Sequence, residues 1–338
     1  MELRASLQEQ LVKVLPAKLV PARGPTLEAY LYGSKSKEAA ASLLQALASA
    51  WGGLPPEVEE LIAGRWWDVG SPALLAVVRE IVSRPPPIAH SAQAMTRDTA
   101  LKLIYELDPV EGRGLILRDL QNVRVEPSMD VIRLLPPAEI AVALPAAIGR
   151  VVKGDARELD YLLLDRSGDE NALQDIGPAF EAQAGNLTCT GQAAMLRYFL
   201  RVAPEYGAAQ VETALAARRT GCYRTLLGGL GPSLTRVEKV AILALDDPEA
   251  PVASNAALAL GQWGTAEAEA PLFNRLRSLA RTEYDAGSQW AVLESTLVGA
   301  IVRNPAWECG PEKFAILRDL VVTPQNRQWI QSMMPPRK

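Results

Sequence analysis

The sequence predicts an all-α fold, an α-solenoid in which about eight or nine antiparallel helix pairs stack into a superhelical array. Three observations predict it. Apolar residues recur at i, i+3, i+4 and i+7 along almost the whole chain, and alternating patterns typical of strands are hard to find. Proline or glycine separates consecutive helical stretches, and one pair of stretches recurs along the chain. We therefore expect one continuous array over 1–338, with an N-terminal capping segment at 1–34 and a C-terminal cap and tail at 323–338.

Each predicted helix spans about three to four turns and lies between two such breaks. Proline ends one helix and suits the first turn of the next, so 25 prolines are compatible with a high helix content. The breaks include Pro55-Pro56, Pro85-Pro86-Pro87, Asp108-Pro109, Pro136-Pro137, Ala203-Pro204, Gly231-Pro232 and Asp247-Pro248. In chain order, helices are predicted over 35–51, 55–67, 71–83, 93–107, 111–121, 137–152, 154–166, 171–183, 189–202, 205–218, 233–246, 249–263, 265–280, 286–303 and 311–322.

The N-terminal segment begins with an amphipathic helical pattern. Leu3, Leu7 and Leu11 share one face, and charged residues lie between them. This pattern lacks the uninterrupted apolar core of a signal peptide. We expect a cytoplasmic protein; an exported precursor whose signal was removed before this numbering began would look the same.

An internal repeat predicts two equivalent helical hairpins. A shift of 95 residues (204 − 109) lays Thr99–Leu120 on Ala194–Leu215, so that Pro109 meets Pro204 and Gly112 meets Gly207. Both segments read as helix, proline turn, helix. We expect the two prolines to occupy equivalent turns.

A third copy with a small change of register covers Ser254–Leu276. Its small residues Ala257 and Gly261, one helical turn apart, should let this helix approach its neighbour closely, and Gly264 should cap its C-terminus.

The residues of this copy resemble the HEAT-like repeat in its short bacterial form. The resemblance rests on Asp246-Asp247-Pro248, Val252, Ala256-Ala257-Leu258-x-Leu260-Gly261, Gly264, Ala268 and the Leu272-x-x-x-Leu276 spacing, although Ser254 stands near where the family usually has arginine. It implies an α-solenoid. It implies no reaction, because HEAT-like arrays occur in scaffolds, adaptors and transport factors, as additions to enzymes, and less often in pigment lyases and DNA-repair glycosylases.

The composition argues against two classes of partner. The net charge is −4, whereas binding along a phosphate backbone requires a positive excess, so nucleic acid is an unlikely partner. The longest apolar stretch, Ile140 to Gly149, is about half of the 20 residues that a membrane-spanning helix needs, and Pro145 interrupts it. We expect no transmembrane segment and a monomer.

No motif indicates a cofactor or a metal. The cluster Gly228-Gly229-Leu230-Gly231-Pro232 lacks the preceding strand and the lysine of a phosphate-binding loop, and is typical of a helix end and turn. The acidic run from Asp165 to Glu170 lacks the glycine and the glutamate of a calcium loop, which leaves a solvated turn as the favoured interpretation.

The sulfur and imidazole groups predict neither a disulfide nor catalysis. Cys189, Cys222 and Cys309 are too few and too far apart for a disulfide framework or a zinc site, so we expect buried thiols in a reducing compartment. The single histidine, His90, lies in a proline-rich loop far from each cysteine, which makes a Cys–His dyad improbable. Trp66 and Trp67 are consecutive, so one of them should be partly exposed.

Charge is distributed in two blocks of opposite sign. Residues 151–183 hold eight acids and three bases, whereas 197–236 hold six arginines and two glutamates. The favoured interpretation is that the blocks face one another as surface ion pairs between repeats. The alternative is a groove with an acidic and a basic zone that orients a charged partner.

Together these patterns favour a non-catalytic scaffold or adaptor that binds a protein or peptide along a concave groove. The second helix of each pair should line this groove. By the internal repeat these helices are 111–121, 205–218 and 265–280, and the regular succession of helices adds 154–166. They should present Arg118, Arg157, Arg218, Arg219, Arg275 and Arg277, and the groove should also include Tyr223 and Arg224. Reversing Arg218, Arg219 and Arg224 to glutamate should leave the fold intact. The alternatives are a lyase- or glycosylase-like enzyme on the same scaffold, or a nucleic-acid clamp.

Overall fold

A computed structural model of the chain describes residues 37–51, 54–66, 70–88, 91–122 and 124–333. Over these ranges the fold is all α, with 18 α-helices, shorter 3-10 and π turns, and no strand. The predicted cap at 1–34 lies outside them. The chain divides into two compact units, residues 1–143 and 144–338. The single continuous array over 1–338 stays a prediction.

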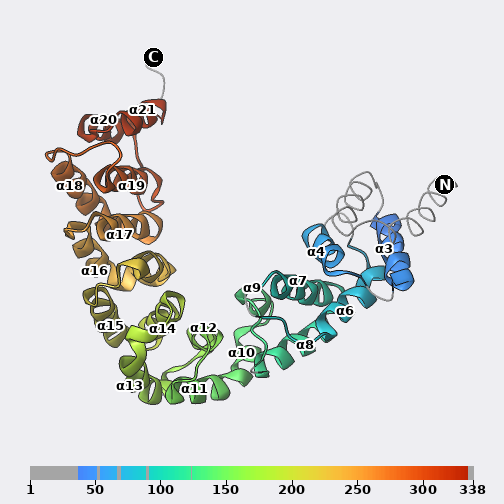
Figure 1. The fold of residues 1–338 in the computed structure, drawn as a ribbon. Helices are drawn as coiled ribbons and strands as arrows, with labels where there is room; N and C mark the ends of the chain where they lie inside the picture. Colours follow the sequence, from blue (N-terminus) through green and yellow to red (C-terminus); the bar gives the residue numbers. More distant parts are fainter. Residues whose placement is uncertain (1–36, 52–53, 67–69, 89–90, 123, 334–338) are drawn as a thin grey trace. The chain divides into compact units, whose positions relative to one another are not determined.

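The first unit is built around α7. Helices α4, α6, α8 and α9 all pack against α7, and α3 packs against the 3-10 turn η2 (Figure 1). The elements are α3 (Lys37–Trp51), α4 (Pro56–Gly64), η2 (Pro72–Leu74), α6 (Leu75–Ser83), α7 (Ala92–Leu107), α8 (Pro109–Gln121), α9 (Met129–Ile132), α10 (Pro137–Ile140) and η3 (Ala141–Ala143).

The second unit begins with α11 (Leu144–Lys153), α12 (Glu158–Ser167), η4 (Glu170–Ala172), α13 (Leu173–Gln183), η5 (Ala184–Asn186), α14 (Cys189–Val202) and α15 (Pro204–Ala216). The turns η6 (Thr220–Cys222), η7 (Arg224–Gly228) and η8 (Gly231–Val237) lead to α16 (Glu238–Leu243) and η9 (Ala244–Asp246). It ends with α17 (Ala250–Trp263), η10 (Ala266–Ala268), α18 (Glu269–Leu279), α19 (Gln289–Arg303), α20 (Pro311–Leu320) and α21 (Pro324–Met333).

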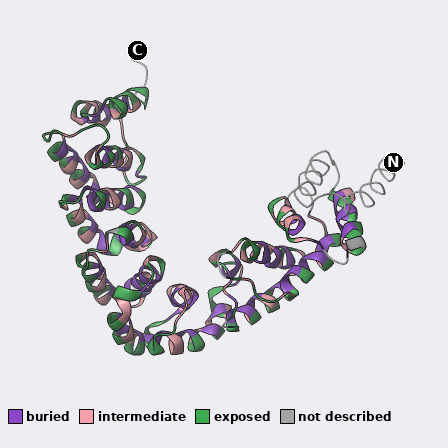
Figure 2. Cartoon of the chain, viewed as in Figure 1, coloured by how far each residue is buried: buried purple, intermediate pink, exposed green. Residues whose placement is uncertain are grey.

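Within the second unit, successive first helices of the hairpins lie side by side. Helix α12 packs against α14, both α14 and α17 pack against the π-helix η7, and α19 packs against α17 and α21. Each remaining helix of the hairpins, from α13 to α20, packs behind a member of this row. A single apolar core runs between the two layers from Val151 to Ile330, and Figure 2 shows the buried faces turned toward neighbouring helices.

The two hairpins predicted by the 95-residue repeat have the same turn. One residue separates the helices in each case: Asp108 with φ −140° and ψ 86°, and Ala203 with φ −144° and ψ 78°. A Cβ atom added at Gly112 would lie 2.6 Å from the backbone nitrogen of Tyr105, and one at Gly207 would lie 2.5 Å from that of Leu200. These pairs are again 95 residues apart. The predicted equivalence is therefore confirmed in backbone conformation and in packing.

The third copy also packs as the small residues predict. Ala257 is fully buried, and a Cβ atom at Gly261 would lie 2.6 Å from Cα of Ala300, so α17 and α19 are nearly in backbone contact. Gly264 caps α17 with an extended backbone. The amide of Asn304 donates to the carbonyls of Leu260 and Gly264, which closes the end of α17 from the next hairpin.

Most predicted helices begin and end within a few residues of the observed ones, but several regions differ. The predicted helix 233–246 is divided into η8, α16 and η9, and the short helix α9 lies between 121 and 137, where no helix was expected. The predicted helix 137–152 is divided into α10, η3 and α11, because Pro145 suits the first turn of a new helix. Short helical turns occupy 220–228, where none was expected. The predicted tail at 323–338 begins with a full helix, α21, whose Ile330 is buried; residues 334–338 lie outside the described ranges.

The expectation of three free thiols is wrong. Cys189 at the start of α14 and Cys222 in η6 form a disulfide, with Cα atoms 5.1 Å apart and a sequence separation of 33. Stacked hairpins bring residues about one repeat apart into contact, a relation that the spacing argument did not use. Cys309 is free and half-buried, and burial raises the pKa of its thiol.

The consecutive tryptophans are only partly described. Trp66 is buried, at 8% exposure. Trp67 lies outside the described residues, so the expectation that one of the two is partly exposed stays a prediction; His90 also lies outside them.

Candidate functional site

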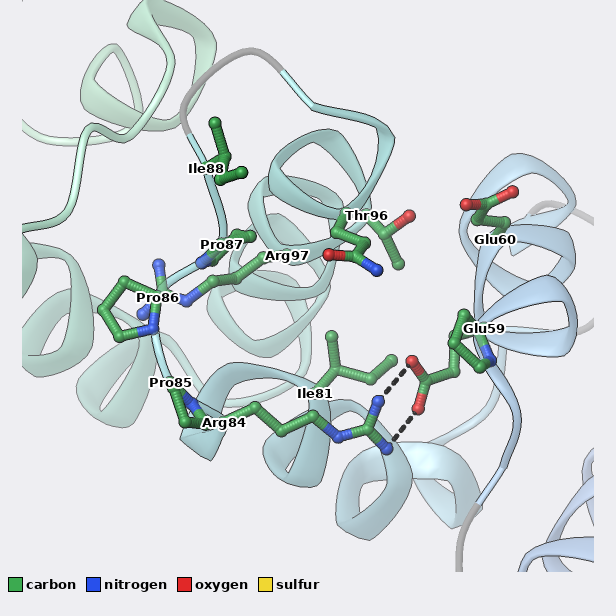
Figure 3. Close-up of a pocket in the computed structure, with 12 residues that line it drawn as sticks. Glu59, Glu60, Ile81, Arg84, Pro85, Pro86, Pro87, Ile88, Thr96 and Arg97 are labelled. Atoms are coloured by element: carbon green, nitrogen blue, oxygen red, sulfur yellow. Dashed lines mark hydrogen bonds and ion pairs between the residues drawn. The ribbon is translucent and has the colours of Figure 1, made fainter.

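A cavity of about 420 Å³ lies in the first unit between α4, α6 and α7 (Figure 3). Pro85, Pro86, Pro87 and Ile88, which follow α6, line one side of it. The lining residues are Pro56, Glu59, Glu60, Ile81, Arg84, Pro85, Pro86, Pro87, Ile88, Gln93, Thr96 and Arg97.

The local sequence shapes this cavity. Helix α6 ends at Ser83, because three consecutive prolines cannot donate the backbone hydrogen bonds of a helix. Arg84, before the first proline, is extended with φ −64° and ψ 159°, as the proline ring requires. The chain returns to helix at α7, where the Ser91 hydroxyl accepts a hydrogen bond from the backbone nitrogen of Ala94 at 3.1 Å. The proline segment thus holds α6 and α7 apart on one side.

A closed ion pair lies at one edge of the cavity. The Arg84 guanidinium donates from two nitrogens to the two carboxylate oxygens of Glu59, at 2.6 and 2.5 Å. Figure 3 shows the two side chains meeting from opposite sides, α6 and α4. Glu59 is only 4% exposed, and burial raises the pKa of its carboxyl against the opposing effect of Arg84. The pair ties the two helices together.

A second buried pair lies behind the proline segment. Arg97 of α7 and Asp119 of α8 are both almost fully buried, with 2.7 Å between Nη1 and Oδ2. In Figure 3 the Arg97 side chain runs toward Pro86. Removing one member of a buried pair leaves an uncompensated charge, so this pair fixes α7 against α8 beside the cavity.

The remaining lining combines apolar walls with open polar groups. Ile81 is buried beneath the cavity, whereas Ile88 is 84% exposed at its rim. Glu60 and Gln93 are exposed and make no hydrogen bond or ion pair with the part of the chain that the structure describes; the Thr96 hydroxyl donates to the carbonyl of Ala92. The arrangement can take an apolar group between the proline rings and the isoleucines, and can offer a carboxylate and an amide to a ligand.

Sequence reasoning missed this cavity. It took Pro85-Pro86-Pro87 only as a break between helices, and none of the twelve lining residues was predicted to form a site. The available signal was the run of three prolines, flanked by Arg84 and by an isoleucine that no neighbouring helix needs to bury.

Three of the arginines predicted to line a groove are bound by the chain itself. Arg157 precedes α12 and pairs with Asp160 at 3.2 Å. Arg218 pairs with Asp247 and, at 2.7 Å, with Glu249.

Arg219 donates to the carbonyls of Ala184 and Leu187 and to the side-chain oxygen of Gln192. It therefore holds neighbouring hairpins together. This corrects the expectation that reversing Arg219 would spare the fold.

The other predicted groove residues do not form one surface. Tyr223 is buried, and its hydroxyl donates to the carbonyl of Leu215, so it has no surface to offer a partner. Arg224 and Arg277 are exposed in the second unit, and Arg118 is exposed in the first. Arg275 is half-buried, with its guanidinium 6.0 Å from the ring centre of Trp290.

The layer assigned to one predicted groove helix is also corrected. Residues 154–166 were taken as a second helix by their rhythm, but α12 packs side by side with α14, the first helix of the matched hairpin. Arg157 therefore belongs to the opposite layer from α15.

The two charge blocks meet, as the favoured interpretation predicts. Arg197 pairs with Asp165 at 2.7 Å, and Arg201 donates to the carbonyls of Leu164 and Asp165 at 3.0 and 2.9 Å. These contacts join α14 to α12. The ion pair therefore joins the two blocks, whereas Arg218 of the basic block pairs with Asp247 and Glu249 outside the acidic block.

Comparison of the sequence with protein-family models and with curated proteins, and of the fold with solved structures, finds no match. In the described ranges, no group of three or more histidine, cysteine, aspartate or glutamate side chains is placed to hold a metal ion. None of the described helices is both long enough and apolar enough to cross a bilayer.

Proposed function

We propose that the chain is a non-catalytic scaffold or adaptor, and that the cavity between α4, α6 and α7 binds a peptide segment of a partner protein. The segment carries an apolar side chain next to a basic one. The observation that carries this proposal is the cavity itself, with apolar walls, two internal ion pairs and two open polar groups.

The ligand chemistry follows from the lining. An apolar side chain fits between Ile81, Ile88 and the proline rings, where complete burial of a Leu- or Phe-sized group contributes about 1.5–3 kcal/mol. The Gln93 amide can hydrogen-bond a peptide backbone, and the Glu60 carboxylate can pair with a lysine or arginine at the mouth. The volume of about 420 Å³ falls within the usual range for ligand pockets.

Three of the four charged lining residues are held in ion pairs, all but Glu60, and this supports binding over catalysis. Glu59 is bonded to Arg84 through both carboxylate oxygens, and Arg97 is paired with Asp119. Groups held in this way define a shape, whereas a general acid or base must be free to exchange a proton with a substrate.

The scaffold that we propose is a HEAT-like α-solenoid. The matched turns at Asp108 and Ala203 support repetition. Side-chain contacts at regular separations support it as well: Arg197–Asp165 spans 32 residues, and the hydrogen bond from Gln210 to Glu181 spans 29. Contacts at such separations are typical of stacked repeats that touch only their neighbours.

For the compartment, we propose the exported alternative rather than the cytoplasm. The Cys189–Cys222 disulfide supports it, because disulfides persist in oxidising compartments and are reduced in the cytosol of most organisms.

The test is a peptide selection on the full chain. Binders are selected from a random dodecapeptide library, and the best is labelled with fluorescein and titrated by fluorescence anisotropy. Ile88→Asp places a charge on the apolar wall at a side chain that is already 84% exposed, so the fold should be unaffected. Val110→Asp is the matched control, because Val110 is also 84% exposed but lies outside the lining.

We expect selected peptides to combine an apolar and a basic residue. Ile88→Asp should weaken binding at least about tenfold, the equivalent of about 1.4 kcal/mol, and Val110→Asp should leave the Kd within twofold. Equal weakening by both variants, or no weakening by Ile88→Asp, would exclude this cavity as the binding site.

A further inference from the structure

A second hollow, of about 460 Å³, lies in the second unit on the face formed by α17, α19 and α21. These three helices are successive neighbours in the row of first helices (Figure 1). The lining residues are Leu258, Gly261, Gln262, Ser295, Thr296, Gly299, Ala300, Arg303, Asn326 and Trp329. None of them lines the cavity of the first unit, so this site is independent of the proposed function.

The hollow exists because its floor has almost no side chains. Gly261 approaches Ala300 so closely that a Cβ atom would lie 2.6 Å from the alanine Cα, and Gly299 adds no side chain beside it. A chain lying in the hollow can therefore approach the backbone of α17 and α19. Larger side chains line its sides: Leu258 of α17, which is 40% exposed, and Trp329 of α21, which is half-buried.

Arg303 is the one charged residue of the lining. Its guanidinium lies 5.7 Å from the ring centre of Trp329, an arrangement that holds the guanidinium plane and leaves its N–H edge free to donate. Among the described residues, Arg303 has no carboxylate within ion-pair distance. Arg303 is thus a cation positioned by Trp329 that has no acidic partner among the described residues.

The helices around the hollow are depleted of acids, although the whole chain has a net charge of −4. Helix α17 carries no charged residue, and α21 carries only Arg327. The single acid of the three helices is Glu294 on α19, which is fully buried.

Hydrogen-bond donors of the same chain already stabilise the charge of Glu294. Burial raises the pKa of this carboxyl, but hydrogen bonds from Thr323, Tyr284 and Asn326 outweigh it and leave the pKa below its ordinary value. The backbone nitrogen of Val322 also donates to it at 2.7 Å. Glu294 therefore stays ionised and saturated with donors, and the open charge of this face is the positive charge of Arg303.

We infer that this hollow binds an extended acidic segment of a partner protein. An aspartate or glutamate of that segment accepts hydrogen bonds from the guanidinium of Arg303. A neighbouring apolar side chain packs between Leu258 and Trp329. The exposed side chains of Gln262 and Ser295, which make no hydrogen bond with the described part of the chain, bind the peptide backbone.

The elongated lining favours a peptide over an isolated anion. Arg303, Gln262 and Ser295 lie on two different helices, and the hollow extends to a third. A single small anion reaches one cation, whereas an extended segment uses the cation, the amide and the apolar walls together.

The test uses the full chain carrying Ile88→Asp, so that recovery of peptides recognised by the first cavity is reduced. Binders are selected from a random dodecapeptide library, and the best is labelled with fluorescein and titrated by anisotropy. Arg303→Met removes the charge and keeps an apolar side chain against Trp329. Arg277→Met is the matched control, because Arg277 is also exposed and stacked on an aromatic ring, 5.8 Å from the centre of Phe273, but lies outside the hollow.

We expect the selected peptides to be enriched in aspartate and glutamate. Arg303→Met should weaken binding about tenfold or more, in line with a hydrogen-bonded charge pair, and Arg277→Met should leave the Kd within twofold. Replacing the acidic residue of the peptide by its amide should weaken binding to the Arg303 protein but cause little further loss with Arg303→Met.

Three results would overturn the inference. The first is a selection that yields no binder or no enrichment of acids. The second is an unchanged Kd for Arg303→Met. The third is displacement of the labelled peptide by inorganic phosphate or acetate alone as effectively as by unlabelled peptide, which would assign the site to isolated anions. Because Ile88→Asp weakens binding to the first cavity throughout, and the proposed function is tested with its own peptide and its own variants, the failure of one proposal can be told from the failure of the other.

Discussion

Opening the Cys189–Cys222 disulfide should destabilise the second unit by several kcal/mol. The bond joins the first residue of α14 to the last residue of η6 and so closes the segment that contains α14 and α15. Cys222 is buried, at 4% exposure. The bond therefore links two adjacent hairpins inside the folded unit, and it keeps them close in the denatured chain as well.

The magnitude follows from the length of the closed loop. For a separation of 33 residues, the loop-closure relation gives about 3.7 kcal/mol at 25 °C, because the bond removes conformational freedom from the denatured chain. Measured native disulfides usually contribute about 2–5 kcal/mol, so a loss of about 3–4 kcal/mol is expected.

The assay compares urea unfolding of the oxidised chain with that of the Cys189→Ser, Cys222→Ser double variant, followed by circular dichroism. Cys309→Ser is the control, because Cys309 is free and outside the loop. A thiol titration in guanidinium chloride provides a second readout. One reactive thiol is expected before reduction and three after it.

Two results would refute this reasoning. Three reactive thiols in the unreduced, unfolded chain would mean that the bond does not form. A urea midpoint that is the same for the oxidised chain and the double variant would mean that the bond does not constrain the denatured state.

Three further predictions concern stability and use the same unfolding assay. Gly112→Ala should lower the free energy of unfolding by about 1–3 kcal/mol, because the added methyl group overpacks against the backbone of Tyr105. Gly114→Ala in the same helix meets open space and should raise the free energy of unfolding by about 0.5–1 kcal/mol. Equal effects of the two substitutions would contradict the packing of α8. Glu294→Gln should destabilise the folded chain at pH 7. The difference in stability from wild type should shrink as the pH falls below about 4.5, because a carboxyl with a depressed native pKa contributes stability only above the pKa of the unfolded chain. A difference that does not change with pH would contradict an ionised Glu294. Arg219→Ala should cost about 1–3 kcal/mol by leaving buried carbonyls unpaired, and Arg224→Ala should stay within about 0.5 kcal/mol; a harmless Arg219→Ala would show that its hydrogen bonds are dispensable.

Local signals predicted the helices and the hairpins well. Proline at the first turn defines α4, α8, α15 and α20, and this effect depends on the proline ring and its immediate neighbours alone. The pairing of Gly112 with Gly207 was visible because the same close backbone contact selects the same residue in both hairpins.

Contacts between hairpins could not be predicted in the same way. The disulfide and the three hydrogen bonds of Arg219 join residues 27 to 35 positions apart, and their formation depends on how one hairpin is rotated on the next. The assignment of 154–166 to the wrong layer has the same cause. The regular succession of predicted helices along the sequence gives their spacing, but it does not show which of the two layers each helix joins. Tyr223 was taken for a surface residue because the turns at 220–228 were not foreseen.

The candidate sites depend on absence of packing, which sequence patterns do not encode. The cavity forms where three prolines stop α6 and no further helix fills the space before α7. The second hollow forms where Gly261 and Gly299 leave a low floor, although the glycine and alanine pattern had already indicated a close approach of two helices.

The most direct test of the proposed function is hydrogen–deuterium exchange of the full chain with and without the selected basic, apolar peptide. Occupation of the cavity should slow exchange in α4 (Pro56–Gly64) and in the segment from α6 (Leu75–Ser83) to the start of α7. Exchange in α17 and α19 of the second unit should be unchanged. Protection confined to the second unit, or no protection in α4 and α6 at saturating peptide, would contradict the assignment of peptide binding to this cavity.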